Sequence, residues 1–224
     1  MTEVVIRNKG LLEQLDGFIE EYFAIDGYDN LENRLHSTQQ ALDNPEYFCG
    51  DEYLQLQLAK GDAHSGFPEE HMAYPISTAV RNHPDKFTTY RDKVKREFAQ
   101  ELGAHSSALL NYYPPGGFVG WHTNWNSNAY QVLFTWSRTG DGYFKYRDPQ
   151  THEIVTIQDV PGWQCRHYYF GRRDEPDYHC WHAAYAGCDR ITLAYKYENQ
   201  HKGHRNDALA QEMRDVLLAD ITEE

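Results

Sequence analysis

The chain has 224 residues, of which 40% are apolar and 25% charged, and its formal net charge is -13. These values predict a folded protein with one sizeable core, and the negative charge disfavours nucleic acid as a partner. No apolar run is long enough for a membrane span, and the N-terminus lacks signal-peptide features. The four cysteines show no CxxC spacing. We therefore expect a cytoplasmic protein with no membrane partner.

Residues 1–105 are predicted to form a mainly helical region that packs on the remainder of the chain. Apolar residues recur at helical spacing between Leu11 and Phe23. A second helix is expected from Lys86 to Leu102, because glycine follows at its end. The segment 48–78 is rich in glycine, proline and histidine, and it predicts irregular coil with room for one short helix.

Short β-prone runs separated by turn signals dominate residues 106–200. The expected strands are Ala108–Tyr113, Tyr130–Trp136, Tyr143–Tyr146, Glu153–Gln158, Gln164–Phe170 and Arg190–Tyr197. Many closely punctuated strands favour a jelly roll. Residues 201–224 carry an amphipathic helix that would contact the barrel or a second copy in a homodimer. The predicted fold class is thus α+β: a double-stranded β-helix core (jelly-roll, cupin-like) with N-terminal helices and a C-terminal helix.

Three residues form a candidate metal site. His122 and Asn124 occupy alternate positions, and His182 follows His122 by 60 residues. Alternate residues of a strand point to the same face, so the first two would lie side by side, and His182 would arrive from a distant strand. Non-haem iron enzymes bind Fe(II) with two histidines and one carboxylate. The pattern predicts this type of site, with asparagine where the carboxylate is expected.

The motifs over residues 106–197 resemble the Fe(II)/2-oxoglutarate-dependent oxygenases, specifically the prolyl 4-hydroxylase and AlkB branches. Tyr113-Pro-Pro-Gly116 lies nine residues before His122, as a Tyr-x-Pro-Gly segment does in prolyl hydroxylases. Asn111 and Tyr113 match a pair that binds 2-oxoglutarate in the AlkB branch. The resemblance implies a 2-oxoglutarate site that includes these two residues.

The strand Arg190-Ile-Thr-Leu-Ala-Tyr-Lys196 is similar to the closing strand of AlkB enzymes. By this resemblance Arg190 would bind the distal carboxylate of 2-oxoglutarate, and Thr192 or Lys196 would assist. A guanidinium suits this task because it binds a carboxylate with two parallel hydrogen bonds and keeps its charge when desolvated.

The resemblance implies an enzyme that uses Fe(II), 2-oxoglutarate and O2, with ascorbate in support, to hydroxylate a small molecule or a peptide side chain. The residues expected at the substrate mouth are Trp121, Trp125, Arg172 and Arg173. The alternatives are a halogenase that uses the asparagine-variant site, an AlkB-like nucleic-acid demethylase, and a non-catalytic barrel that acts as a binding module.

Asn124 leaves four outcomes open. Its amide oxygen could bind iron, a carboxylate such as Asp141 could substitute, the position could stay open to water or halide, or iron binding could be lost. His179 competes with His182 as the second histidine. We favour His182, because it follows an aromatic residue and precedes Arg190 at a family-like distance.

Overall fold

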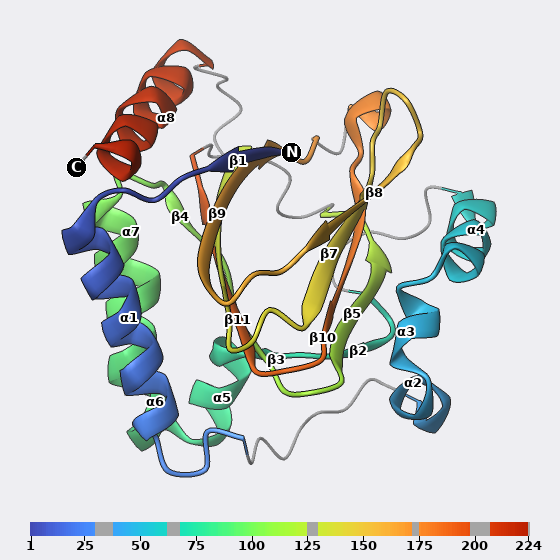
Figure 1. Ribbon diagram of the computed structural model, residues 1–224, viewed down its shortest axis with the longest axis horizontal. Coiled ribbons are helices and arrows are strands. Elements are labelled where there is room, and N and C mark those ends of the chain that lie inside the picture. The colour runs from blue at the N-terminus through green and yellow to red at the C-terminus, as the bar shows by residue number, and fades with distance from the viewer. Residues whose placement is uncertain (30–37, 62–67, 125–129, 172–174, 198–206, 224) are drawn as a thin grey trace.

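Two antiparallel sheets form the core of the protein, seen here in a computed structural model (Figure 1). The structure describes residues 1–29, 38–61, 68–124, 130–171, 175–197 and 207–223. The larger sheet has the strand order β1-β9-β6-β11-β4-β3, and the smaller sheet has the order β2-β5-β10-β7-β8. From β4 to β7 and again from β8 to β11, consecutive strands alternate between the sheets, as in a jelly roll, so the predicted double-stranded β-helix core is confirmed.

The strands are β1 (Thr2–Val4), β2 (His71–Met72), β3 (Tyr74–Pro75), β4 (Ser106–Tyr113), β5 (Gly117–His122), β6 (Tyr130–Ser137), β7 (Gly142–Arg147), β8 (Ile154–Gln158), β9 (Gly162–Tyr169), β10 (Trp181–Ala186) and β11 (Arg190–Lys196). The helices are α1 (Lys9–Ala24), α2 (Gln39–Asp43), α3 (Pro45–Phe48), α4 (Asp51–Ala59), α5 (Ile76–Asn82), α6 (Pro84–Asp92), α7 (Phe98–Glu101) and α8 (Asp207–Thr222). A π-helical turn, Lys93–Glu97, joins α6 to α7, and a 3-10 turn spans Pro176–Tyr178.

Helices cover the outer face of the larger sheet. Figure 1 shows α1, α6 and α7 along this face, with α8 near one end. Helix α1 begins at Asn8, whose side-chain oxygen accepts a hydrogen bond from the backbone N–H of Leu11 at 2.9 Å. Its apolar stripe, including Phe18, packs with Phe134 and Leu193 of the sheet in the main hydrophobic core. No helix in the described part of the chain is long and apolar enough to cross a membrane.

A second hydrophobic core lies on the outer face of the smaller sheet. There α2, α3 and α4 pack against β5 and β10, and the buried residues include Phe48, Leu54, Phe118 and Trp121. Both sheets are therefore covered on the outside, which leaves their inner faces to enclose the space between them.

The N-terminal region departs from the prediction in two ways. Residues 48–78 were expected to be irregular coil with room for one short helix; α4 is such a helix, but the segment also includes β2 and β3. The short strands β1, β2 and β3 join residues 1–105 to both sheets. Strands of two or three residues show no periodicity in a sequence, so pattern analysis cannot find them. The division into regions at 105 and 200 stays a prediction.

Candidate functional site

The two predicted metal-binding histidines lie side by side between the sheets. His122 ends β5 and His182 lies near the start of β10, and the two residues pair directly in the antiparallel ladder. Their ring centroids are 4.1 Å apart. Both residues are 7% exposed and both line the same cavity. The structure therefore brings together two imidazoles that the sequence separates by 60 residues.

A β-bulge in β5 turns His122 toward the cavity. Ala184 pairs with Val119 and His182 pairs with His122, so three steps along β5 match two steps along β10. The extra residue changes which side chains face inward, because strand side chains otherwise alternate strictly. Val119 and His122 both line the cavity, while Trp121 packs on the outer face.

Backbone carbonyls fix the orientation of both rings. The Nδ1 atom of His122 lies 2.9 Å from the carbonyl oxygen of Gly120, and Nδ1 of His182 lies 2.9 Å from that of Cys180. A hydrogen bond to a carbonyl requires the proton on Nδ1, so Nε2 is the nitrogen with the lone pair in each ring. A ring held by such a carbonyl contact is typical of histidines that bind metals.

His182 is held in its neutral form, which is the form that binds metals. Burial lowers its pKa to about 4, although its hydrogen bond to Cys180 acts in the opposite direction. The rings of Phe144 and Phe170 lie 5.6 and 5.1 Å from the His182 ring, and they contribute to this apolar environment.

An acidic ligand that would join the two histidines is not found among the residues that the structure describes. Asn124 also lines the cavity, two residues after His122 in the chain. Within the described ranges, no group of three or more histidine, cysteine or acidic residues could hold a metal ion. Asp141 lies in the turn between β6 and β7, where its carboxylate approaches Gly187, and it is not a cavity residue. This placement corrects the idea that Asp141 replaces the missing carboxylate.

The cavity between the sheets has a volume of about 200 Å³. Its apolar wall includes Leu133, Phe144 and Phe170. Its polar wall comes mainly from the larger sheet, where Asn111, Thr192 and Thr135 pair in register across three strands.

Arg190 forms a buried ion pair that the sequence did not indicate. Its Nε donates to Oδ2 of Asp159 at 2.8 Å, and the two side chains are 3% and 2% exposed. Its Nη1 donates to Oγ1 of Thr192 at 2.8 Å, and its guanidinium lies 5.0 Å from the ring centroid of Tyr113. Burial is the largest single influence on Arg190 and opposes its charge, but Asp159 and Tyr113 together outweigh burial and the pKa of Arg190 is raised.

The ion pair bears on the predicted role of Arg190. A ligand carboxylate bound there would share the guanidinium with Asp159, and two like charges 4 Å apart repel by about 4 kcal/mol at an effective dielectric constant near 20. Binding of 2-oxoglutarate by Arg190 stays a prediction. Thr192 accepts a hydrogen bond from Arg190 and lines the cavity, whereas Lys196 lies at the far end of β11 and is not among the cavity residues. Their part in binding 2-oxoglutarate also stays a prediction.

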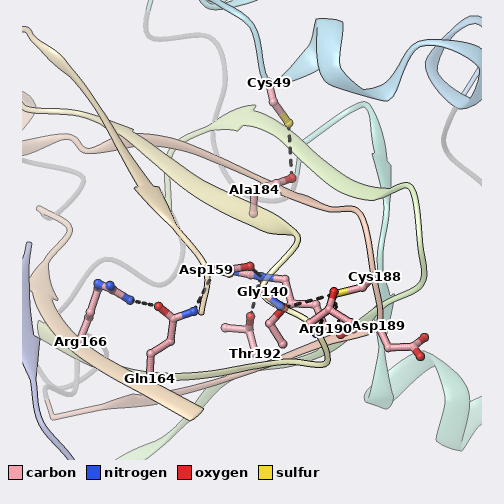
Figure 2. A network of polar contacts seen from close by, with 12 residues as sticks. Cys49, Gly140, Asp159, Gln164, Arg166, Ala184, Cys188, Asp189, Arg190 and Thr192 are labelled. Carbon is pink, nitrogen blue, oxygen red and sulfur yellow. Dashed lines mark hydrogen bonds and ion pairs between the residues drawn. The ribbon is translucent and has the colours of Figure 1, made fainter. Parts of the chain in front are cut away.

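Asp159 also connects Arg190 to a second arginine of the cavity (Figure 2). Its Oδ1 accepts a hydrogen bond from Nε2 of Gln164 at 3.0 Å. Oε1 of Gln164 in turn accepts one from Nη1 of Arg166 at 2.5 Å. Figure 2 shows these side chains as one continuous network from Arg166 to Thr192.

Asn111 and Tyr113 face the cavity together from β4. Asn111 is 1% exposed, and its side-chain oxygen has no hydrogen-bond partner. Burial raises the pKa of the Tyr113 phenol, and Arg190 acts against that shift. Since buried polar groups are nearly always paired in folded proteins, the Asn111 oxygen marks a place for a ligand or an ordered water.

The predicted substrate-mouth residues are only partly described. Trp121 is 1% exposed, and its indole N–H donates to the carbonyl of Gly50 at 3.0 Å on the outer face of the smaller sheet. This corrects its placement: Trp121 is a core residue held under α3 and α4. Trp125, Arg172 and Arg173 lie outside the described residues.

Sequence reasoning missed two cavity residues, Asp159 and Arg166, and the buried Gln164 that joins them. Asp159 lies between β8 and β9 and precedes Pro161-Gly162, so it has the signature of a turn residue. The alternation of β9 carried a usable signal for Arg166, because Cys165 packs in the outer core and its neighbours must face inward.

Comparisons with known proteins give structural similarity only. No protein-family model and no curated relative matches the chain. A prolyl-4-hydroxylase from Pseudomonas putida is 13% identical, with a TM-score of 0.33, over 79% of this chain and 98% of that one. A 2OG-Fe(II) oxygenase family oxidoreductase from Burkholderia pseudomallei is 14% identical, with a TM-score of 0.31, over 53% of this chain and 54% of that one.

The structure of OsALKBH1 is similar over 50% of this chain and 63% of that one, with 13% identity and a TM-score of 0.29. The chain thus spans less than two thirds of the length of this protein. The structures that it resembles include Fe(II)/2-oxoglutarate oxygenases, as the sequence motifs predict. At these TM-scores the likeness carries no argument about activity, which must come from the cavity itself.

Proposed function

We propose that the protein is a non-haem iron oxygenase that uses 2-oxoglutarate and O2 to hydroxylate a small molecule or a peptide side chain. The observation that carries this proposal is the pairing of His122 with His182, with both rings oriented by backbone carbonyls inside a cavity. Neutral imidazoles are good ligands for Fe(II) at neutral pH. Iron and 2-oxoglutarate would together supply the oxidising chemistry.

The donor set fits iron, with an amide in the place where a carboxylate is usual. His122 and His182 supply two nitrogen ligands, and Asn124 supplies an amide oxygen or leaves a position open. An amide is neutral, so the metal keeps more positive charge here than in a site with a carboxylate. This favours an anionic co-substrate, and it also suits a halide, so halogenation is the second candidate.

The protein's own residues would orient the reactants and exclude water. The aromatic and aliphatic wall around Phe144, Phe170 and Leu133 makes one side of the cavity dry. The rigid hydrogen bonds of the two histidines fix the direction of their lone pairs. Polar groups of the larger sheet face this wall and would hold the organic acid in place.

Anaerobic titration with Fe(II) tests the site, followed by an assay of 2-oxoglutarate turnover in air. The wild-type protein should bind one iron and release succinate. His122→Ala and His182→Ala should each weaken iron binding by about tenfold or more and abolish turnover. His179→Ala is the matched control, because this histidine lies only three residues before His182 and is not a cavity residue.

Two results would contradict the proposal. Full iron binding in either alanine variant would show that the pair is not the metal site. A metal-free wild-type protein with a stable fold would favour a binding module. Product analysis with and without chloride would then separate hydroxylation from halogenation.

A further inference from the structure

Arg166 lines the cavity and has no acidic partner among the residues that the structure describes. Among the described residues, the cationic side chains that line the cavity are Arg166 and Arg190. Arg190 is paired with Asp159. Arg166 donates to the neutral amide oxygen of Gln164, and no ion pair joins it to an acid within the described ranges. In the described part of the cavity wall, Arg166 is therefore a guanidinium without a counter-charge; the other cationic group there outside Arg190 is the N-terminal ammonium of Met1, which donates to the hydroxyl of Tyr146.

The fold holds Arg166 in this place. It pairs with Leu133 of β6 on one side and with Glu3 of β1 on the other. Leu133 lines the cavity, so Arg166 faces the same space from the neighbouring strand. Glu3 is exposed at the sheet edge, where water screens its charge. Arg166 is half-buried, so its charge acts in a region of lower dielectric than the surface.

We infer that Arg166 binds the carboxylate of a small ligand in the cavity, and that Asp159 and Gln164 are the residues that position its guanidinium. The inference deepens the proposed function and rests on it only for the identity of the ligand. The carboxylate belongs either to 2-oxoglutarate or to the primary substrate, since both would meet the same guanidinium.

Charge compensation favours Arg166 over Arg190 as the receptor. A carboxylate at Arg190 would lie beside Asp159, whose charge already neutralises that guanidinium. A carboxylate at Arg166 meets a guanidinium with several N–H groups still available, because arginine has five donors and Gln164 accepts from one nitrogen. A two-point contact is therefore sterically and electrostatically open at Arg166.

The buried oxygen of Asn111 adds an independent indication of a ligand. This atom has no hydrogen-bond partner, and the residue lines the same cavity from β4. Asn111 and Gln164 lie in the same register row of the larger sheet, separated by Thr192 and Thr135. A ligand that carries a carboxylate at one end and a hydroxyl or N–H donor at the other would satisfy both Arg166 and Asn111.

Calorimetric titration of 2-oxoglutarate under nitrogen tests whether the carboxylate that Arg166 binds is that of the co-substrate. The protein is used both loaded with Fe(II) and metal-free in EDTA. A second experiment tests whether the carboxylate is that of the primary substrate. It detects binding of propionate by saturation-transfer NMR in protein that is saturated with 2-oxoglutarate. Arg166→Gln should weaken binding of one probe by about tenfold to a hundredfold, and Arg166→Lys should restore part of it.

Arg138→Gln is the matched control, because this arginine is exposed and pairs with Asp189 away from the cavity. Thermal melting checks that each variant folds. A weaker 2-oxoglutarate affinity in Arg166→Gln assigns the carboxylate to the co-substrate. An unchanged affinity with loss of the propionate signal assigns it to a second, substrate-like acid.

Unchanged binding of both probes in Arg166→Gln would overturn the inference, and so would a wild-type protein that binds neither. Failure of the proposed function has a different signature. Carboxylate binding that depends on Arg166 but occurs without any iron binding would reject the oxygenase and support Arg166 as an anion receptor.

Discussion

The carboxylate of Asp159 and the guanidinium of Arg190 form an ion pair at 2.8 Å that is almost completely removed from solvent. Buried pairs differ from surface pairs because each charge depends on the other to offset its loss of hydration. Asp159 also accepts a hydrogen bond from Gln164, so one carboxylate organises both arginines of the cavity.

We expect Asp159→Asn to lower the free energy of unfolding by about 3 kcal/mol, because Arg190 would remain buried without a counter-charge. Urea denaturation measures this change. Asp26→Asn is the control: it removes a partner of Lys86, but the Asp26 side chain is 99% exposed, so less than about 1 kcal/mol should be lost. Equal losses in the free energy of unfolding of the two variants would show that the buried pair contributes no more to stability than the exposed one.

His182 should make the stability of the metal-free protein depend on pH. Its pKa is lowered from 6.5 in the unfolded chain to about 4 by burial, so the unfolded state binds more protons between these values. Stability is therefore complete above about pH 6.5 and falls as the pH drops toward 4, by up to about 3 kcal/mol. Urea denaturation in EDTA across this range should show a steeper slope for the wild-type protein than for His182→Gln. Identical slopes would contradict the prediction.

Glycine at position 120 is required by a close approach of the backbone. A Cβ atom there would lie 2.9 Å from the carbonyl oxygen of Glu70, and the Gly120 carbonyl also accepts the hydrogen bond from His122. Gly120→Ala should destabilise the fold by about 1–3 kcal/mol and weaken Fe(II) binding. Gly17→Ala is the matched control, because nothing lies within 4 Å of its added Cβ and helix α1 should gain about 1 kcal/mol. Thermal melting should therefore show a loss of stability in Gly120→Ala and a gain in Gly17→Ala. Iron titration should show weaker binding in Gly120→Ala and unchanged binding in Gly17→Ala.

Asn124→Asp should complete a site with two histidines and one carboxylate. We expect Fe(II) affinity to rise by about tenfold or more, because a charged oxygen ligand replaces a neutral one. Asn124→Ala separates the two possible roles of the native amide: weaker binding would indicate an amide ligand, and unchanged binding would indicate an open position. An Asn124→Asp variant with no gain in affinity would show that residue 124 does not reach the metal.

The sequence contains enough information to predict the jelly roll and the meeting of His122 with His182. Alternating strands and ordered motifs are local signals, and strand pairing then brings the two histidines together. The role of Asp159 could not be predicted, since an acidic residue before Pro161-Gly162 has the composition of any turn. Its contact with Arg190 spans 31 residues and depends on how β8 is connected to β9.

Trp121 shows a different limit of sequence reasoning. Its position beside His122 suggests a place at the cavity, and strict alternation correctly puts neighbouring residues on opposite faces. The bulge decides whether Trp121 or His122 faces inward, and no residue pattern in β5 predicts the bulge. The orientation of this strand is decided by its pairing with β10 and by the carbonyl of Gly50 that receives the indole N–H.

The single extra residue of β5 also decides which of two adjacent rings lies beside His182. Between Val119 and His122 the chain changes parity, so the residues before and after the bulge obey opposite inward and outward rules. Without the bulge, strict alternation from Val119 would place the indole of Trp121 in the cavity and the imidazole of His122 beneath α3. A local irregularity of strand pairing, rather than a residue type, thus selects an imidazole instead of an indole as the neighbour of His182.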